Sequence, residues 1–244
     1  VPTNAAGVMA LRTLGRLGGV AAVDFVTQYR LAERLAGPAL RAEHRLPVST
    51  AVVDLAVRAV LAETSTAFDD VADHPSTVVA LRDVHRELRA AGPEALQRLA
   101  AASARGRQVA QVSRLVTDRL RGAWYDEGDL MQQATSVVRD GELHRALSQV
   151  VVFLPQSSTP LDVELLRALG ERGSVQVVLG SSGDADADSD VIAFARRLSS
   201  EPIAAVAPDR SAVTELVSVT DADEEVRHAL RVVVEAARSG TPLA

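Results

Sequence analysis

The acidic stretch WYDEGDL (Trp124–Leu130) holds side chains that could bind a magnesium ion. Carboxylate oxygens are ligands that magnesium accepts, and in a motor NTPase such an acid pair follows an apolar strand. Here Arg119 and Arg121 precede the acids in a helical pattern instead. The stretch is therefore interpreted as a turn between two helices, capped by Asp126 or Asp129, rather than as a metal site.

A second acidic run, DADADSD (Asp184–Asp190), alternates its carboxylates as a calcium loop does. An EF-hand loop needs Gly at its sixth position and a bidentate Glu at its twelfth. Counted from Asp184, those positions hold Ser189 and Ala195. The run is interpreted as a solvated loop that leads into the N-terminus of a helix, where acids are favourable.

The other residue types that often carry chemistry form no recognisable pattern. The five histidines are scattered, and no two have the spacing of a zinc-binding helix. No serine lies in a G-x-S-x-G elbow, and GRLGG and GSSG do not form a dinucleotide fingerprint. We expect no catalytic residue, no metal and no cofactor in this chain.

All 26 basic residues are arginine. A P-loop needs lysine to reach the β- and γ-phosphates, so this chain cannot supply one and is expected not to hydrolyse ATP. Five arginines lie close together in ARGRQVAQVSRLVTDRLRG: Arg105, Arg107, Arg114, Arg119 and Arg121. They could form a strip that faces phosphates, or they could belong to an ordinary amphipathic helix.

The charge is distributed unevenly. Residues 1–150 carry 18 Arg against 17 Asp and Glu, whereas residues 151–244 carry 8 Arg against 15. The net charge of −6 argues against bulk electrostatic capture of nucleic acid, but it permits a local arginine-lined track in the first half.

The 244 residues include no cysteine, which fits a reducing cytoplasm. No apolar run approaches the roughly 18 residues that a membrane helix needs, and we expect no signal peptide. We therefore expect a cytoplasmic protein without membrane contact. Because the sequence begins at Val1, we expect it to be a fragment of a longer chain.

The stretch from Leu147 to Gly180 has the pattern of strand, helix and strand. Val150–Leu154 is an apolar run, and Thr159 followed by Pro160 is a strong helix start. In a motor NTPase this strand would end in acids that hold magnesium, but here it ends in Pro155-Gln156-Ser157-Ser158.

The remaining pattern indicates an α/β fold with a helical insertion. Val20–Val26, Val150–Leu154 and Val175–Leu179 are expected as strands of one parallel sheet, joined by right-handed crossovers. Residues 40–147 have helical spacing throughout. We expect one domain from residues 1–39 and 148–244, with 40–147 as a helical subdomain inserted into it.

Four segments, in order, resemble the N-terminal half of AddB-type proteins, the helicase-like nuclease subunits of bacterial double-strand-break repair, which are related to superfamily I helicases. VPTNAAGVMALRTL resembles motif Ia, FVTQYRLAERLAG resembles motif Ib, and VVVFLPQSSTPLDVELLRAL resembles the motif II region. LVSVTDADEEVRHALRVVVEAARSGTPLA is similar to the segment before motif IV. The order and spacing of these segments carry the resemblance more than any single motif does.

This resemblance implies a RecA-like parallel sheet, as in P-loop helicases, in which ATP hydrolysis is lost and left to a partner helicase–nuclease subunit. The retained fold would serve as a scaffold that reads DNA. The absence of acids after Val150–Leu154 fits that role, and the nuclease site of the family would lie beyond Ala244.

The resemblance also implies five residues that face single-stranded DNA. In motif Ia the turn after the strand corresponds to Thr3 and Asn4. In motif Ib the corresponding residues are Thr27 and Tyr29, and the adjacent Arg30 could meet a phosphate. Tyr29 could stack on a base, whereas the structural alternative is that Thr27 only caps a helix and Tyr29 only packs.

Three functions follow as hypotheses. The first is a catalytically degenerate helicase-like subunit that holds or scans DNA during break processing and recombination, and binds single strands weakly on its own. The second is a working superfamily I ATPase whose P-loop lies outside this sequence. The third is an α/β–helical protein-interaction module without DNA contact, which the net negative charge favours.

Overall fold

The computed structural model describes residues 1–141, 147, 149–155, 158–184, 186–198 and 217–241. The chain divides into two compact units, Val1–Val206 and Ala207–Ala244. The described part of the first unit is mostly helical and contains two separate hydrophobic cores.

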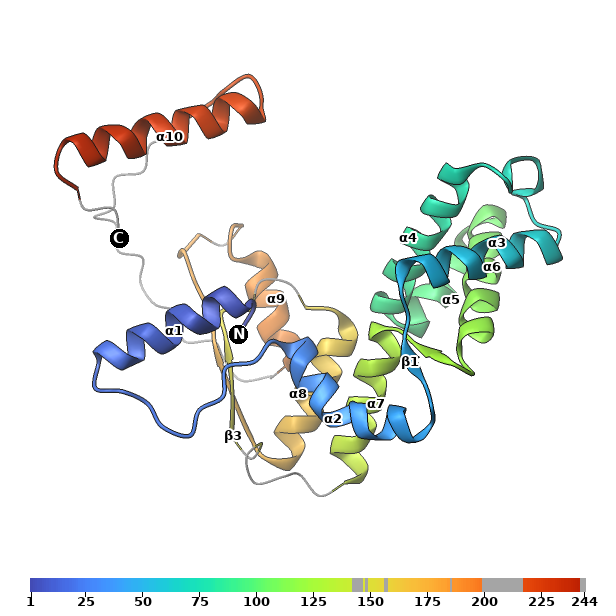
Figure 1. Ribbon diagram of the computed structural model, residues 1–244, viewed down its shortest axis with the longest axis horizontal. Coiled ribbons are helices and arrows are strands. Elements are labelled where there is room, and N and C mark those ends of the chain that lie inside the picture. The colour runs from blue at the N-terminus through green and yellow to red at the C-terminus, as the bar shows by residue number, and fades with distance from the viewer. Residues whose placement is uncertain (142–146, 148, 156–157, 185, 199–216, 242–244) are drawn as a thin grey trace. The chain divides into compact units, whose positions relative to one another are not determined.

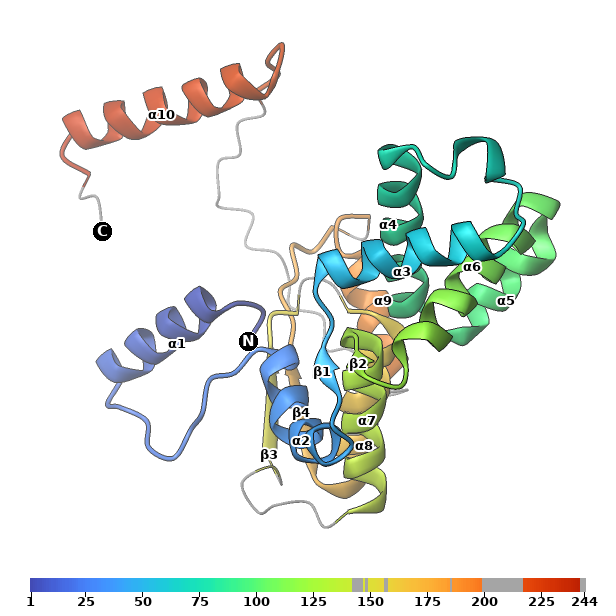
Figure 2. The same cartoon turned by 45° about the vertical axis from the view of Figure 1, so that its right-hand side comes forward.

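The first core lies around α7 (Glu127–Asp140) and the two helices that pack against it, α2 (Gln28–Ala42) and α8 (Pro160–Arg172) (Figures 1 and 2). Each of these helices turns a row of apolar residues inward, as an amphipathic helix does. Fully buried leucines occupy the centre: Leu40, Leu130, Leu165 and Leu169. Helix α9 (Ser189–Leu198) adds Phe194 to the same core.

The second core lies between α3 (Thr50–Glu63), α4 (Pro75–Ala91) and α6 (Ala104–Leu120). Valines dominate it: Val53, Val57, Val60, Val78, Val112 and Val116 are all buried. A short 3-10 turn, Asp69–Val71, connects α3 to α4. Helix α5 (Pro93–Ala102) packs against α6.

The strands form two small parallel sheets. β1 (Leu46–Pro47) pairs with β2 (Trp124–Tyr125), and β3 (Gln149–Phe153) pairs with β4 (Ser174–Val178). Side chains alternate across the β3–β4 pair. Val152, Val175 and Val177 pack on the first core, while Val151 and Val178 on the opposite face are exposed.

The expected α/β fold with a RecA-like sheet is wrong. Val150–Leu154 and Val175–Leu179 do overlap a parallel pair, but that pair has only two strands in the described chain, and Val20–Val26 is not a strand. Ala22 adopts a left-handed backbone with φ of 58°, which interrupts an extended run. The middle of the chain is helical as expected, apart from the short strands β1 and β2.

The expected domain boundaries stay a prediction. Helix α7 falls inside the 40–147 range and contributes Leu130, Met131 and Val138 to the first core. Gln156 and Ser157, which follow β3, lie outside the described residues.

Two helices expose apolar side chains. In the first unit, Gly7 is the one buried residue of α1 (Asn4–Arg16), while Val8, Met9 and Leu11 are about half exposed or more. In the second unit, α10 (Ala222–Arg238) begins at the Asp221 cap and has no buried residue. Its exposed apolar residues are Val226, Leu230, Val232, Val233 and Val234.

Candidate nucleic-acid interface

The residues expected to face DNA lie at the starts of α1 and α2. Thr3 is the N-cap of α1, and its Oγ1 accepts a hydrogen bond from the backbone N–H of Ala6 at 3.1 Å. Asn4 is the first residue of that helix and is exposed. Thr27 caps α2 in the same way, accepting from the backbone N–H of Arg30 at 3.3 Å. Both threonines therefore have the capping role that the structural alternative assigns to Thr27.

The starts of α1 and α2 are held side by side. The backbone nitrogen of Val1 donates to the carbonyl oxygen of Val26 at 3.0 Å. Gly7 of α1 packs on Phe25, where an added Cβ would lie 3.2 Å from the Phe25 Cβ. These two contacts place Thr3 and Thr27 at neighbouring helix ends, although no sheet precedes them in the described chain.

A third helix begins beside α2. The Gln28 side chain donates through Nε2 to the carbonyl oxygen of Asp162 at 2.9 Å, in the first turn of α8. Thr159 caps α8, and a capping box closes its start, because the Asp162 carboxylate accepts from the Thr159 N–H at 2.7 Å. Three threonine-capped helix starts are therefore linked through α2.

The three helix starts differ in charge. Neither α1 nor α2 carries an acidic residue in its first turn, whereas α8 carries Asp162. The N-terminus of a helix has partial positive charge and unpaired N–H groups, so it favours anions. The ends of α1 and α2 retain this capacity, while the α8 end is already neutralised by its own carboxylate.

Tyr29 and Arg30 lie at the rim of this region. Tyr29 is 37% exposed, so it is not a core residue. Arg30 is exposed and pairs with Glu33 at 2.6 Å, one turn along α2. Partial burial, followed by the nearby Glu33, Tyr125 and Glu127, raises the pKa of Tyr29 above its ordinary value. The phenol is therefore neutral at pH 7, with acidic side chains nearby.

The acidic stretch WYDEGDL supplies a helix cap, as interpreted from the sequence: Asp126 is the N-cap of α7. The Asp126 carboxylate accepts from the backbone N–H of Asp129 at 2.7 Å, and Asp129 accepts in return from the N–H of Asp126. Arg89 of α4 binds both carboxylates, with Nε 2.6 Å from Asp126. Arg45 binds Asp129 at 2.6 Å. Burial acts to raise the pKa of Asp126, but the hydrogen bonds and charge of Arg89 outweigh it and hold that pKa below its ordinary value.

The acidic loop before α9 is organised around one carboxylate. Asp188 accepts hydrogen bonds from the backbone N–H and hydroxyl of Ser182, both at 2.9 Å, and from the hydroxyl of Ser181 at 2.7 Å. A further bond comes from the N–H of Gly183 at 3.0 Å. These donors, led by the Ser182 N–H, lower the pKa of Asp188 to about 2. The expected solvated loop therefore contains one acid, Asp188, that is only 8% exposed.

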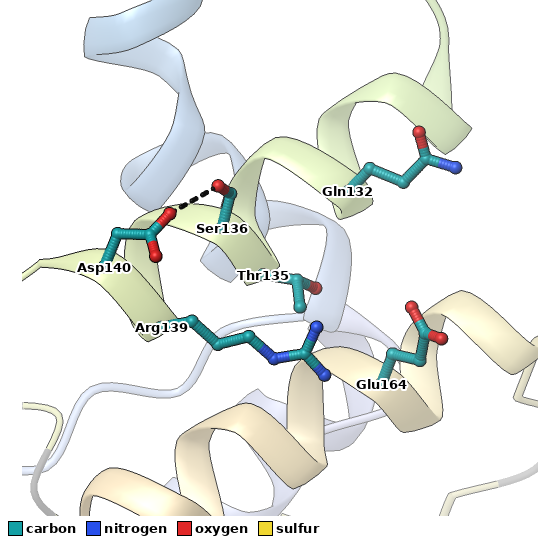
Figure 3. A pocket seen from close by; sticks show the side chains of 6 residues that line it. All are labelled: Gln132, Thr135, Ser136, Arg139, Asp140 and Glu164. Carbon is teal, nitrogen blue, oxygen red and sulfur yellow. Dashed lines mark hydrogen bonds between the residues drawn. The ribbon is translucent and has the colours of Figure 1, made fainter.

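A polar hollow of about 260 Å³ lies between α7 and α8 (Figure 3). Its hydroxyls are already used: Ser136 donates to Asp140 at 2.9 Å, and Thr135 donates to the Met131 carbonyl at 2.9 Å. Arg139 extends from α7 toward Glu164 of α8 without forming an ion pair with any described residue. The Ser136–Asp140 pair spans one turn of α7, and no histidine or lysine that could activate the hydroxyl is among the residues that line the hollow.

Sequence reasoning missed the pairs that form across long sequence separations. Arg89 meets Asp126 across 37 residues, and His85 meets Ser113 across 28. No local spacing signals such contacts. Within the described ranges, no group of three or more His, Asp or Glu side chains could hold a metal ion. No helix in that part of the chain is both long enough and apolar enough to cross a membrane.

A scan against protein-family models finds no match to this chain, and a search of curated proteins finds none either.

Proposed function

We propose that this chain is part of a non-catalytic, AddB-type subunit that holds single-stranded DNA during the processing of double-strand breaks, beside a partner helicase–nuclease subunit. The ordered resemblance of four segments motivates the proposal. The observation that supports it most is that contacts of Val1 with Val26 and of Gly7 with Phe25 join the start of α1, with Thr3 and Asn4, to the segment just before Thr27.

Two adjacent helix starts without first-turn acids suit a phosphate backbone. Each offers N–H groups and partial positive charge to an oxygen anion, and Asn4 adds an exposed amide. Backbone phosphates of a single strand would lie over these ends.

Tyr29 would supply the contact to a base. It is partly exposed, and an aromatic ring stacks on any base without reading its identity, contributing roughly 1–3 kcal/mol. Arg30 would reach a phosphate once it leaves Glu33, and that exchange is inexpensive because the pair is exposed. The interface would therefore bind single strands without sequence preference.

The salt dependence of single-strand binding tests the phosphate contact. Arg30→Ala should lower the slope of log affinity against log salt by about one contact, because one fewer counterion is released. Arg34→Ala is the matched control, since it removes the same charge from the same helix, where Arg34 pairs with Asp24. Equal slopes for the two variants would contradict a specific role for Arg30.

A second function, a protein-interaction module, is favoured by the exposed apolar side chains of α1. Val8, Leu11 and Leu14 recur every third residue along that helix and are all at least 37% exposed. Apolar patches on a surface often mark contacts with other proteins. The occupant we propose is the partner helicase–nuclease subunit.

Co-purification tests this second function. The double change Val8→Ser and Leu11→Ser should weaken association with the partner subunit while leaving single-strand binding intact. Arg12→Ser, on the same helix, is the control. Retained association would contradict this function, and a loss of DNA binding would show that the exposed apolar side of α1 contacts DNA as well as its start.

A further inference from the structure

A cavity of about 320 Å³ opens between the end of α4, the start of α5 and one face of α6. Its lining is rich in hydrogen-bond donors: Arg89, Ser113, Arg114, Thr117, Arg121 and Gln132. Asp118 is the one acidic residue in this described lining. The cavity is built from different elements than the α1–α2 interface, and what it binds does not depend on the function proposed above.

The balance of charge in the cavity is positive. Arg89 is already neutralised by Asp126 and Asp129. Arg121 pairs with Asp118 at 2.9 Å, but both side chains are more than half exposed, so that pair is weak. Arg114 forms no ion pair with any residue that the structure describes. Among the described residues, the Arg114 guanidinium therefore has no ion-pair partner and that of Arg121 has only a weak one, although the net charge of the chain is −6.

The lining of the cavity includes a buried hydroxyl, that of Ser113. Ser113 is 4% exposed, and its Oγ lies 2.9 Å from Nδ1 of His85, which is 3% exposed. Burial lowers the pKa of His85, so the ring is neutral at pH 7. With the ring proton on Nδ1, His85 donates to Ser113 and leaves the hydroxyl proton for an oxygen atom in the cavity.

We propose that this cavity binds a phosphate group, with Arg114 and Arg121 as its charged ligands and Ser113 as a neutral hydrogen-bond donor. A tetrahedral oxyanion accepts hydrogen bonds from several directions, which suits donors placed on separate turns of α6. A carboxylate would need only one guanidinium fork.

The phosphate could belong to a nucleic-acid backbone or be free in solution. Arg107 is exposed and lies seven residues before Arg114, the same step that separates Arg114 from Arg121. Seven residues are about two helical turns, or roughly 10 Å, so the three arginines follow one side of α6. A strand whose phosphate enters the cavity would continue along this row.

Titration of the purified chain tests the proposal and identifies the source. Inorganic phosphate and a thymine 20-mer are titrated separately at low salt, by calorimetry and by the fluorescence of Trp124, the one tryptophan of the chain. The double variant Arg114→Gln and Arg121→Gln should weaken whichever ligand binds by about tenfold or more, as expected for lost charge-assisted bonds. Arg119→Gln is the control, because Arg119 pairs with Glu63 and does not line the cavity.

The two titrations distinguish a free phosphate from a nucleic-acid backbone as the ligand. Binding of phosphate alone identifies a free-phosphate site, and binding of the 20-mer with competition by phosphate identifies a backbone site. The proposal is overturned if the wild type binds neither ligand, if the double variant binds as the wild type does, or if Arg119→Gln weakens binding equally. Unchanged circular dichroism shows that the variants fold. Tyr29→Ala in the same assay separates a failure of this cavity from a failure of the α1–α2 interface.

Discussion

Asp188 shows how one carboxylate can organise a loop. Four donors from Ser181, Ser182 and Gly183 converge on it, and each stabilises the charged form more than the protonated one. The residue thereby fixes the turn that leads into α9, which contributes Phe194 to the first core.

The pH dependence of this loop follows from that geometry. The pKa of Asp188 is about 2 when folded, below the ordinary value near 3.9, so its contribution to stability is complete above about pH 4. The contribution is lost as the pH falls through 2. Carbon-13 NMR of the side-chain carboxyl should show a midpoint near pH 2 that disappears in Asp188→Asn. A midpoint near 4 would contradict the hydrogen bonding described here.

Arg89 joins α4 to the start of α7 by pairing with two carboxylates, Asp126 and Asp129. Removing it would leave Asp126 and Asp129, both less than a quarter exposed, with Arg45 as their remaining cation. Arg89→Ala should lower the free energy of unfolding by about 2–3 kcal/mol, less than for a fully buried pair. Urea unfolding measures this, and Arg119→Gln, which opens an exposed pair, should have little effect. Equal effects would contradict the account of the junction.

At the scale of elements, the α5–α6 hairpin depends on Gly106. A Cβ at this position would overlap the carbonyl oxygen of Leu99, so only glycine lets the two helices meet this closely. The contact shapes one wall of the arginine-lined cavity, because α5 and α6 supply Leu96 and Ser113 to it.

Gly106→Ala should therefore destabilise the protein by about 1–3 kcal/mol, through a forced shift of backbone. Gly15→Ala is the control, since nothing lies within 4 Å of a Cβ there and alanine favours a helix by up to about 1 kcal/mol. Thermal unfolding should move in opposite directions for the two variants. A neutral Gly106→Ala would show that the helices separate freely.

Elements with local signals could be predicted from the sequence. Thr159-Pro160 begins α8, and Asp126 caps α7, because a cap needs only residues within one turn. Val20–Val26, which is not a strand, shows where such local signals fail. A short apolar run becomes a strand only if neighbours pair with it, and the described chain offers this segment no ladder.

In the candidate sites too, only the residues with local sequence signals could be predicted. Thr27 could be recognised as a helix cap, but its nearness to Thr3 depends on the contacts of Val1 with Val26 and of Gly7 with Phe25, which have no local signal. The cavity ligands Arg114 and Arg121 belong to the arginine strip noted in the sequence, but Ser113 and His85 gave no local signal. The hydrogen bond between His85 of α4 and Ser113 of α6 forms only because these two helices pack together.

At the scale of the whole molecule, the chain combines two cores with exposed apolar helices and local positive sites on a net-negative surface. Electrostatic attraction from the whole surface does not favour DNA at this net charge, so any binding must come from local contacts. The proposed scaffold role therefore depends on a few residues rather than on overall charge.

The most direct test of that role is the affinity of the complete subunit, in its complex, for single-stranded DNA when Tyr29 is changed. Tyr29→Ala should weaken binding by roughly 1–3 kcal/mol through lost stacking, while Tyr29→Phe, which keeps the ring, should bind as the wild type does. If Tyr29→Ala binds DNA as tightly as the wild type, Tyr29 does not face DNA and the interaction-module function takes its place.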